Sequence, residues 1–380
     1  MAEQPPRLAM VAGEASGDLL ASLLLTGLRE RWPGIRTAGI GGPKMGALGF
    51  EAWWPSDRLA VRGYFEVLRH YREIAGIRDQ LAARLLAEPP DAFVGVDAPD
   101  FNLGLEARLK KAGIKAVHFA CPSVWAWRGG RTARMARSVD HVLCLFPFEP
   151  ELLRRHGIAA TYVGHPLADA IPLEPPRAAA RAALGLGEAD RVVAVLPGSR
   201  RSEIQYIGPT FIAAAALMQR QDPSLRLLLP VAPGLMPMLE PMVAAHAAGA
   251  DLRLVDGRSH EVMAACDVAL VASGTATLEA ALFKRPMVIG YRMHALSWQL
   301  MKRMRYQPWV GLPNILAREF LVPELLQGDC TPEALARAAR QWLDDAPASE
   351  AVARRFTDIH HTLRQDTARR ATDALAQILG

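Results

Sequence analysis

The sequence predicts an α/β protein built from two doubly wound parallel sheets, and three observations lead to this prediction. Short apolar runs that end in Gly, Pro or acidic residues alternate with longer stretches of helical periodicity, as parallel strands buried on both faces do. The alternation stops at a Pro- and Ala-rich segment, residues 165–190, and then starts again. The chain has 380 residues and is 51% hydrophobic, which is more than one core normally holds.

Each half of the chain contains five predicted strands. In the first half they lie at residues 7–11, 36–40, 92–96, 115–119 and 141–145, with the clearest helices at residues 19–31 and 103–112. In the second half they lie at residues 192–196, 225–231, 252–255, 268–272 and 287–290. We therefore expect two Rossmann-like domains, residues 1–170 and 171–349, facing a central cleft, with ligands at the carboxyl ends of the strands. The helical segment 350–380 closes the chain and can pack back on the first domain.

Composition excludes several classes of protein. The net charge of +5 is a mild excess, which suits anionic partners such as nucleotide phosphates or an anionic membrane face, and we expect no nucleic acid partner. The four cysteines are scattered, without a C-x-x-C pair, so neither a disulfide framework nor a metal site is expected. The first residues lack the layout of a signal peptide, and the longest charge-free stretch, residues 204–219, is too short for a membrane span. A cytoplasmic protein is the expectation.

The loop GEASGD (residues 13–18) follows the first predicted strand and opens a helix. Its two glycines allow close approach of a ligand, and the helix N-terminus offers free N–H groups. Ser16 and the acidic side chains suit sugar hydroxyls better than phosphate. Asp18 has two interpretations, a cleft residue or the N-cap of a helix that begins at Leu19. Glu14 has no capping role to explain it and is a candidate functional carboxylate.

A second loop, DAPDFN (residues 97–102), follows the strand at residues 92–96. Asp100 stands where a helix begins, and capping accounts for it. Asp97 stands one residue beyond a buried strand, at the end where ligands bind, with no evident capping role. A carboxylate there can take the proton of a hydroxyl nucleophile, so Asp97 is the candidate general base.

Two further loops carry weaker signals. Residues 39–43 (GIGGP) form a glycine-rich turn that lacks both the G-x-G-x-x-G spacing and the acidic residue of a dinucleotide site, so a structural turn is expected. Trp125, Trp127 and Arg128 follow another strand and fit either an acceptor wall or packing between domains. The sequence leaves these two interpretations open.

Two loops of the second half predict a nucleotide-diphosphate site. In LPGSRRSE (residues 196–203), Gly198 and Ser199 offer backbone and hydroxyl donors, and Arg200 can fork onto a diphosphate. In SGTATLE (residues 273–279), three small residues, Ser273, Gly274 and Thr275, stand at a helix N-terminus and can cradle a phosphate. With Thr275 as the N-cap, Glu279 lies one turn inside the helix, off the capping-box spacing, where it can hold a ribose diol.

These motifs, taken together, resemble the lipid-A-disaccharide synthase family. GEASGD, DAPDFN, PSVWAWR, LPGSRRSE, SGTATLE and the stretch from GYR (residues 290–292) to LPN (residues 312–314) occur in that family's order, over residues 11–327. SGTATLE alone indicates only a sugar transferase of the GT-B fold. The six together are highly specific.

The resemblance implies a GT-B-like fold and an inverting, metal-independent hexosyltransferase without a cofactor. The implied donor is UDP-2,3-diacylglucosamine, the acceptor is 2,3-diacylglucosamine 1-phosphate, and the product is the β-1,6-linked lipid A disaccharide 1-phosphate of Gram-negative lipopolysaccharide. It places the UDP-binding residues in the C-terminal domain: Gly198, Ser199, Arg200, Ser273, Gly274, Thr275, Glu279, Tyr291 and Arg292. The resemblance assigns catalysis to Asp97, with Glu14 as the reserve candidate. It assigns Ser16, Asp18 and Asn314 to acceptor binding and to the cleft.

Acylated substrates imply peripheral attachment to the inner membrane. Residues 59–86 combine apolar positions at near-helical spacing with arginines such as Arg69 and Arg72, and residues 298–309 offer a second such segment. Stripes of this kind are as often core-facing helices. A homodimer is also compatible with the family.

Three other classes of protein compete with this interpretation. An NAD-dependent enzyme would need the glycine fingerprint that the sequence lacks. A non-catalytic lipid- or nucleotide-binding protein would not need carboxylates at strand ends. Another GT-B enzyme, a UDP-N-acetylglucosamine 2-epimerase or an N-acetylglucosaminyltransferase, is the nearest alternative.

Overall fold

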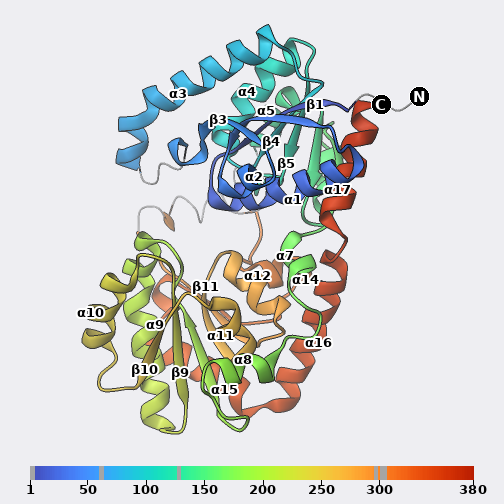
Figure 1. Ribbon diagram of the computed structural model, residues 1–380. Helices are drawn as coiled ribbons and strands as arrows, with labels where there is room; N and C mark the ends of the chain where they lie inside the picture. The colour runs from blue at the N-terminus through green and yellow to red at the C-terminus, as the bar shows by residue number, and fades with distance from the viewer. Residues whose placement is uncertain (1–4, 60–63, 126–129, 295–297, 300–305) are drawn as a thin grey trace. The chain divides into compact units, whose positions relative to one another are not determined.

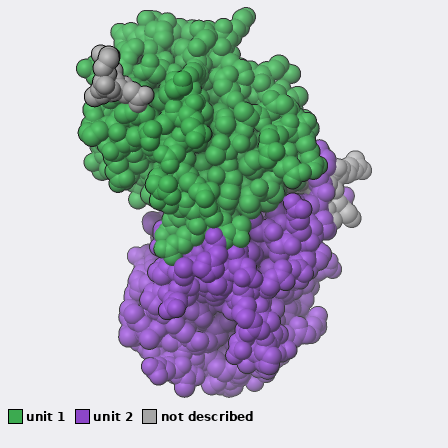
Figure 2. All heavy atoms as spheres, turned by 90° about the vertical axis from the view of Figure 1, so that its right-hand side faces the viewer, with its two compact units in different colours: residues 1–169, 362–380 green, residues 170–361 purple. Residues whose placement is uncertain are grey.

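The computed structural model describes residues 5–59, 64–125, 130–294, 298–299 and 306–380. The chain divides into two compact units, shown in two colours in Figure 2. Unit 1 comprises Met1–Asp169 and Thr362–Gly380, and unit 2 comprises Ala170–His361. Each unit has its own sheet and its own core.

Unit 1 is a seven-stranded parallel sheet. Its strands are β1 (Arg7–Ala12), β2 (Arg36–Gly41), β3 (Glu51–Pro55), β4 (Ala92–Val96), β5 (Lys115–Phe119), β6 (His141–Cys144) and β7 (Ala159–Tyr162). They lie in the order β3-β2-β1-β4-β5-β6-β7. The direction of winding therefore reverses between β1 and β4, which is where open α/β sheets bind ligands.

Helices of unit 1 cover both faces of this sheet. They are α1 (Ala15–Arg31), α2 (Pro43–Ala47), α3 (Tyr64–Ala87), α4 (Pro99–Lys111), α5 (Arg131–Ser138), α6 (Glu149–Arg154), α7 (Pro166–Ala170) and α17 (Thr367–Leu379). One core contains Leu24, Leu28 and Leu375, from α1 and α17, and another contains Leu81 and Leu109, from α3 and α4.

The C-terminal helix α17 returns to unit 1 and lies beside α1 (Figure 1). A Cβ at Gly27 would come within 2.5 Å of Thr372 Oγ1, so the two helices approach more closely than a side chain at this position would allow. Three backbone N–H groups at the start of α17, those of Gln365, Asp366 and Thr367, donate to the Asp169 carboxylate. These contacts anchor the last helix to the first unit.

Unit 2 is a six-stranded parallel sheet wound in the same way. Its strands are β8 (Val192–Leu196), β9 (Arg226–Val231), β10 (Leu252–Asp256), β11 (Val268–Ala272), β12 (Met287–Tyr291) and β13 (Glu324–Leu326), in the order β10-β9-β8-β11-β12-β13. Its helices are α8 (Arg177–Ala183), α9 (Arg201–Gln221), α10 (Met236–His246), α11 (Ser259–Ala265), α12 (Thr275–Leu282), α14 (Leu312–Ala317), α15 (Pro332–Asp344) and α16 (Ala346–Leu363). Here the winding reverses between β8 and β11.

Two further features bear on the expectations from sequence. Among the helices within the described ranges, none combines the length and the apolar character that crossing a membrane requires. All four cysteines are free thiols.

Candidate functional site

In unit 1 the predicted acidic loops follow β1 and β4, the two strands at the reversal point. They touch each other: a Cβ added to Gly13 would lie 3.1 Å from the Cβ of Ala98. Glu14 and Asp97, the residues that follow Gly13 and precede Ala98, therefore belong to neighbouring loops at one end of the sheet. The topology thus places the two loops that carry the candidate catalytic carboxylates side by side.

Asp97 has an unusual backbone conformation. Its φ is +52°, and that of Ala98 is +43°, so two successive non-glycine residues are left-handed. Such conformations cost energy and are concentrated at functional sites. The Asp97 N–H donates to Phe119 O at 2.9 Å, and Asn102 Nδ2 donates to Asp97 O at 2.8 Å. Neighbouring elements therefore fix the backbone of this half-buried residue through its amide and its carbonyl, and neither bond uses its carboxylate.

Asp100 does not cap a helix, and that expectation is wrong. The helix α4 begins at Pro99, with Ala98 at the N-cap position and no side-chain cap. Asp100 instead lies in the first turn, where its exposed carboxylate accepts from Arg131 Nη2 at 2.7 Å. A surface ion pair of this kind contributes little to stability.

The expected capping role of Asp18 is also wrong. The helix α1 begins at Ala15, with Glu14 at the N-cap position, although the Glu14 side chain makes no capping hydrogen bond. The Asp18 side chain is only 3% exposed and accepts from three backbone N–H groups at the start of α2, those of Gly42, Lys44 and Met45, at 3.0–3.1 Å. Asp18 therefore holds the glycine-rich turn, while Ser16 remains exposed in the first turn of α1.

In unit 2 a pocket of about 290 Å³ lies at the reversal point between β8 and β11. It gathers seven of the nine residues predicted to bind UDP, namely Gly198, Ser199, Arg200, Ser273, Gly274, Thr275 and Glu279. The N-termini of α9 and α12 both border it, because Arg200 and Thr275 line its wall. Helix N-termini stabilise negative charge, so the pocket suits an anionic group.

The loop after β8 depends on a glycine and an arginine. Gly198 has a φ of +108°, and a Cβ there would lie 2.7 Å from Glu203 Oε2, so a side chain at this position would be both strained and obstructed. Arg200 occupies the N-cap position of α9, and its Nη1 donates to Glu203 Oε1 at 2.6 Å. Its side chain is 57% exposed, which leaves the guanidinium accessible to a ligand.

The loop after β11 begins its helix one residue earlier than predicted. Gly274, not Thr275, is the N-cap residue of α12, and the Ser273 hydroxyl donates to Val310 O at 3.0 Å. Glu279 lies in the second turn, and its Oε1 is 2.9 Å from Nε2 of His260 on α11. The hydrogen bond to Glu279 raises the pKa of His260 in spite of its partial burial. His260 was not predicted from sequence, although its place shortly after the end of β10, in the first turn of α11, is where such a residue could have been sought.

Three predicted residues of unit 2 do not line this pocket. Tyr291 ends β12, where burial and the charge of Glu203 raise its pKa. Arg292 donates to Thr210 Oγ1 at 2.9 Å. Asn314 is fully buried, donates to Val322 O and to Glu324 Oε1, and accepts from Val322 N. The Asn314 side chain thus holds the chain around β13 together.

The aromatic loop after β5 is described only in part. Trp127 and Arg128 lie outside the described residues. The indole of Trp125 donates to Glu149 Oε1 at 2.9 Å and meets the rings of Phe146 and Phe148 edge to face. Glu149 is fully buried, which raises its pKa to about 8. Nothing in the sequence marks this glutamate as buried, so no local pattern predicts its role.

The basic, apolar stripe is in part a core-facing helix. Leu81 and Leu85 of α3 are buried in the core of unit 1. Arg72, on the same helix, is exposed. The Arg69 side chain and residues 300–305 of the second segment lie outside the described part of the chain.

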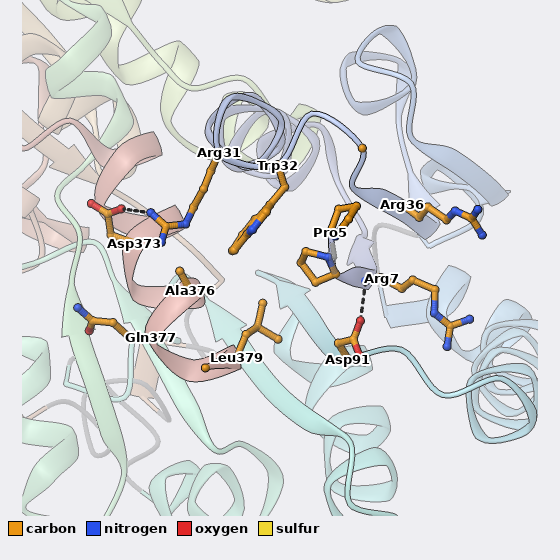
Figure 3. A pocket seen from close by; sticks show the side chains of 13 residues that line it. Pro5, Arg7, Arg31, Trp32, Arg36, Asp91, Asp373, Ala376, Gln377 and Leu379 are labelled. Carbon is orange, nitrogen blue, oxygen red and sulfur yellow. Dashed lines mark hydrogen bonds and ion pairs between the residues drawn. The ribbon is translucent and has the colours of Figure 1, made fainter. Parts of the chain in front are cut away.

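Another hollow of unit 1 lies away from these loops. It has a volume of about 1040 Å³ and is bordered by Arg7, Arg36 and Asp91, which stand at the amino ends of β1, β2 and β4 (Figure 3). Both of its carboxylates are already engaged: Asp91 accepts from the Arg7 N–H, and Asp373 pairs with Arg31. The predicted loops lie at the opposite, carboxyl ends of the strands.

Within the described residues, no group of three or more His, Cys, Asp or Glu side chains is placed to hold a metal ion.

Comparison with known proteins places the chain in a family. The family model described as lipid-A-disaccharide synthetase matches residues 8–378. The lipid-A-disaccharide synthase of Verminephrobacter eiseniae is 60% identical over 385 residues, covering 99% of this chain and 98% of that protein. That of Albidiferax ferrireducens is 59% identical over 379 residues, covering 98% and 97%.

Solved structures share the fold at low sequence identity. The UDP-GlcNAc 2-epimerase of Neisseria meningitidis, solved with UDP-GlcNAc, superposes with a TM-score of 0.66 at 11% identity, covering 98% of this chain and 99% of that one. Acinetobacter baumannii MurG superposes with a TM-score of 0.62 at 14% identity, with the same coverage. These neighbours confirm the predicted GT-B-like fold of two Rossmann-like domains, and the family match shows that the chain belongs to the lipid-A-disaccharide synthase family of glycosyltransferases.

Proposed function

We propose that the chain is an inverting hexosyltransferase that joins UDP-2,3-diacylglucosamine to 2,3-diacylglucosamine 1-phosphate. The products are the β-1,6-linked lipid A disaccharide 1-phosphate and UDP. The observation that carries this proposal is the pocket of unit 2, where an arginine loop, a helix N-terminus of small residues and a carboxylate line one cavity.

The pocket suits the UDP part of the donor. Arg200 can fork onto the diphosphate, and the backbone N–H groups at the start of α12 can bind its oxygens. Glu279, held by His260, presents a carboxylate of the kind that accepts hydrogen bonds from a ribose diol. Tyr291 and Arg292 lie outside the pocket wall, so we assign them no direct contact with UDP.

Asp97 in unit 1 is the proposed general base. The acceptor's 6-hydroxyl attacks the anomeric carbon of the donor, its proton passes to the Asp97 carboxylate, and the bond to the diphosphate breaks with its electron pair leaving on UDP. One displacement of this kind inverts the anomeric configuration. Glu14, on the adjoining loop, is the reserve candidate for the base.

The leaving group needs its negative charge stabilised as the bond breaks. Arg200 and the dipoles of α9 and α12 can supply this stabilisation, because all three border the same pocket. We therefore propose a reaction that needs neither a metal ion nor an organic cofactor.

Both substrates carry acyl chains, so we propose that the protein attaches peripherally to the inner face of the inner membrane. The exposed Arg72 on α3 supports an electrostatic contribution to this attachment.

Reconstitution tests the proposed function. The purified chain is incubated with the diacylated donor and acceptor, and the lipids and nucleotides are analysed by mass spectrometry. We expect stoichiometric disaccharide 1-phosphate and UDP. Epimerisation of UDP-N-acetylglucosamine, or transfer only to an acceptor that lacks acyl chains, would contradict the proposal and favour another enzyme of this fold.

A further inference from the structure

Directly behind Asp97 lies a buried polar cluster, formed by Asn102 and Glu106 of α4 and His118 of β5. All three side chains are fully buried. His118 Nδ1 and Glu106 Oε1 are 2.7 Å apart. Asn102 connects the cluster to the catalytic loop, because its Nδ2 donates to Asp97 O.

A glycine in β4 leaves space for this cluster against the sheet. Gly95, two residues before Asp97, is the register partner of His118 on the neighbouring strand. A Cβ at Gly95 would lie 2.2 Å from Glu106 Oε1 and 3.0 Å from the Cβ of Asn102. The missing side chain at Gly95 therefore makes room for the Glu106 carboxylate against β4.

Burying this cluster costs folding free energy, which a purely structural role does not explain. Glu106 Oε2, His118 Nε2 and Asn102 Oδ1 are all buried and have no hydrogen-bond partner among the described residues. A buried ion pair with incomplete hydrogen bonding contributes little to stability, and apolar side chains of similar volume often serve a fold better. A role in function accounts for such a pair more readily.

Two acidic groups, Glu106 and Asp97, act on the charge of His118. Burial by itself lowers the pKa of an imidazole, but the charge of Glu106, the hydrogen bond to it and the charge of Asp97 together raise the pKa of His118. Burial raises the pKa of Glu106, and the positive charges of His118 and of Arg134 on α5 oppose that rise. Glu106 of α4 and Asp97 after β4 both favour a positive charge on His118.

We propose that His118 and Glu106 form a positioning pair for Asp97, in which Glu106 holds a positively charged His118 near the carboxyl end of β4 and that charge keeps the Asp97 carboxylate oriented toward the acceptor. This inference rests on the proposed role of Asp97 as general base. His118 touches no substrate, because it is fully buried. Before the transfer Asp97 is a carboxylate, and afterwards it carries the acceptor's proton.

The kinetic test removes the charge and keeps the hydrogen bond. In His118→Asn the amide can take the place of Nδ1 and still donate to Glu106, and Glu106→Gln preserves the shape of its partner. We expect kcat to fall roughly ten-fold in each variant, in the range seen for members of one network, with the KM for the donor unchanged. The double variant should lose no more than either single variant, since the pair acts as one unit.

His141→Gln is the matched control. His141 lies at the amino end of the next strand, β6, where its Nε2 lies 2.8 Å from Thr161 Oγ1. We expect this variant to keep the wild-type kcat. A kcat near wild type in folded His118→Asn would overturn the proposal, as would an equal loss in His141→Gln.

A spectroscopic test leaves the buried pair intact. The ¹⁵N signals of the His118 ring are followed against pH in the wild type and in Asp97→Asn. Because the charge of Asp97 helps raise the pKa of His118, we expect the midpoint for His118 to fall in the variant. Identical midpoints would overturn the coupling even if the His118 variants did not fold.

The two tests separate this inference from the proposed base. If Asp97→Asn abolishes turnover while His118→Asn keeps it, Asp97 remains the base and the positioning pair is wrong. If Asp97→Asn keeps turnover, the base is wrong, whatever the His118 signals show.

Discussion

His260 Nε2 lies 2.9 Å from Glu279 Oε1, so the carboxylate that lines the pocket of unit 2 is held from the first turn of a neighbouring helix. Glu279 lines the pocket and His260 stands beside Ser259, which lines it too. The contact joins α11 to α12 at the pocket wall. It also makes this wall sensitive to pH.

The contact between His260 and Glu279 should make the stability of the protein depend on pH. The hydrogen bond to Glu279 raises the folded-state pKa of His260, so its contribution to stability is fully present below the ordinary imidazole pKa and is lost as pH rises through the raised value. We expect His260→Gln to have a lower Tm than the wild type at about pH 5.5, with the difference shrinking toward about pH 8.5. His246→Gln, at an exposed position of α10, is the control, and a pH-independent difference for His260→Gln would refute the linkage.

Arg200 should govern the affinity for UDP. A charge-assisted hydrogen bond contributes ~1.5–3 kcal/mol, so Arg200→Ala should raise the Kd for UDP by roughly ten-fold or more. Arg201→Ala is a matched control, because Arg201 is exposed and does not line the pocket. Isothermal titration calorimetry measures both variants. An unchanged Kd for UDP in Arg200→Ala would show that Arg200 does not bind the diphosphate.

Replacing Asp97 should affect chemistry and not binding. A positioned base contributes ~10²–10⁴-fold, so Asp97→Asn should lower kcat by about that factor while the Kd for UDP and the unfolding transition stay close to wild type. Asp100→Asn, three residues away and exposed, should retain activity. Turnover of Asp97→Asn within a few-fold of wild type would move the role of base to Glu14.

Turnover should not depend on divalent cations. In the proposed reaction, Arg200 and the two helix N-termini that border the pocket supply the positive charge that a metal would otherwise supply to the leaving diphosphate. We expect the rate to be unchanged after dialysis against a chelator, in an assay of disaccharide formation. Loss of activity that magnesium restores would show that this charge is insufficient.

Association with membranes should be partly electrostatic. Exposed arginine on α3 should favour anionic lipid, by an attraction that salt screens over about 10 Å at 0.1 M. In vesicle sedimentation we expect binding to anionic vesicles at low salt, weaker binding at high salt, and a further reduction in Arg72→Glu. Neutral vesicles serve as the control, and salt-independent binding to both kinds would contradict the electrostatic part.

Central strands were predictable from sequence because they are buried on both faces. All ten predicted strands are present, and β4, β5, β8 and β11 have the predicted bounds. The three missed strands, β3, β7 and β13, lie at sheet edges. Their residues are partly exposed, so they lack the continuous apolar run that marks a central strand.

The positions of the polar loops were predictable from sequence, but the roles of several of their residues were not. Loops at the carboxyl ends of strands around the reversal points could be identified, and seven of the predicted residues line one pocket. The roles of Asp18 and Asn314 depend on backbone groups distant in sequence, at α2 and β13, and no local pattern indicates such contacts. The same holds for His118 and Glu106, which meet only when α4 packs on β5.

The stereochemistry of the new glycosidic bond tests the proposed single displacement most directly. The purified chain is supplied with the α-linked UDP donor and the diacylated acceptor, and the anomeric configuration of the disaccharide is determined by NMR. We expect a β-1,6 linkage, formed by attack of the 6-hydroxyl on the face opposite UDP. An α linkage would contradict a single displacement with Asp97 as base.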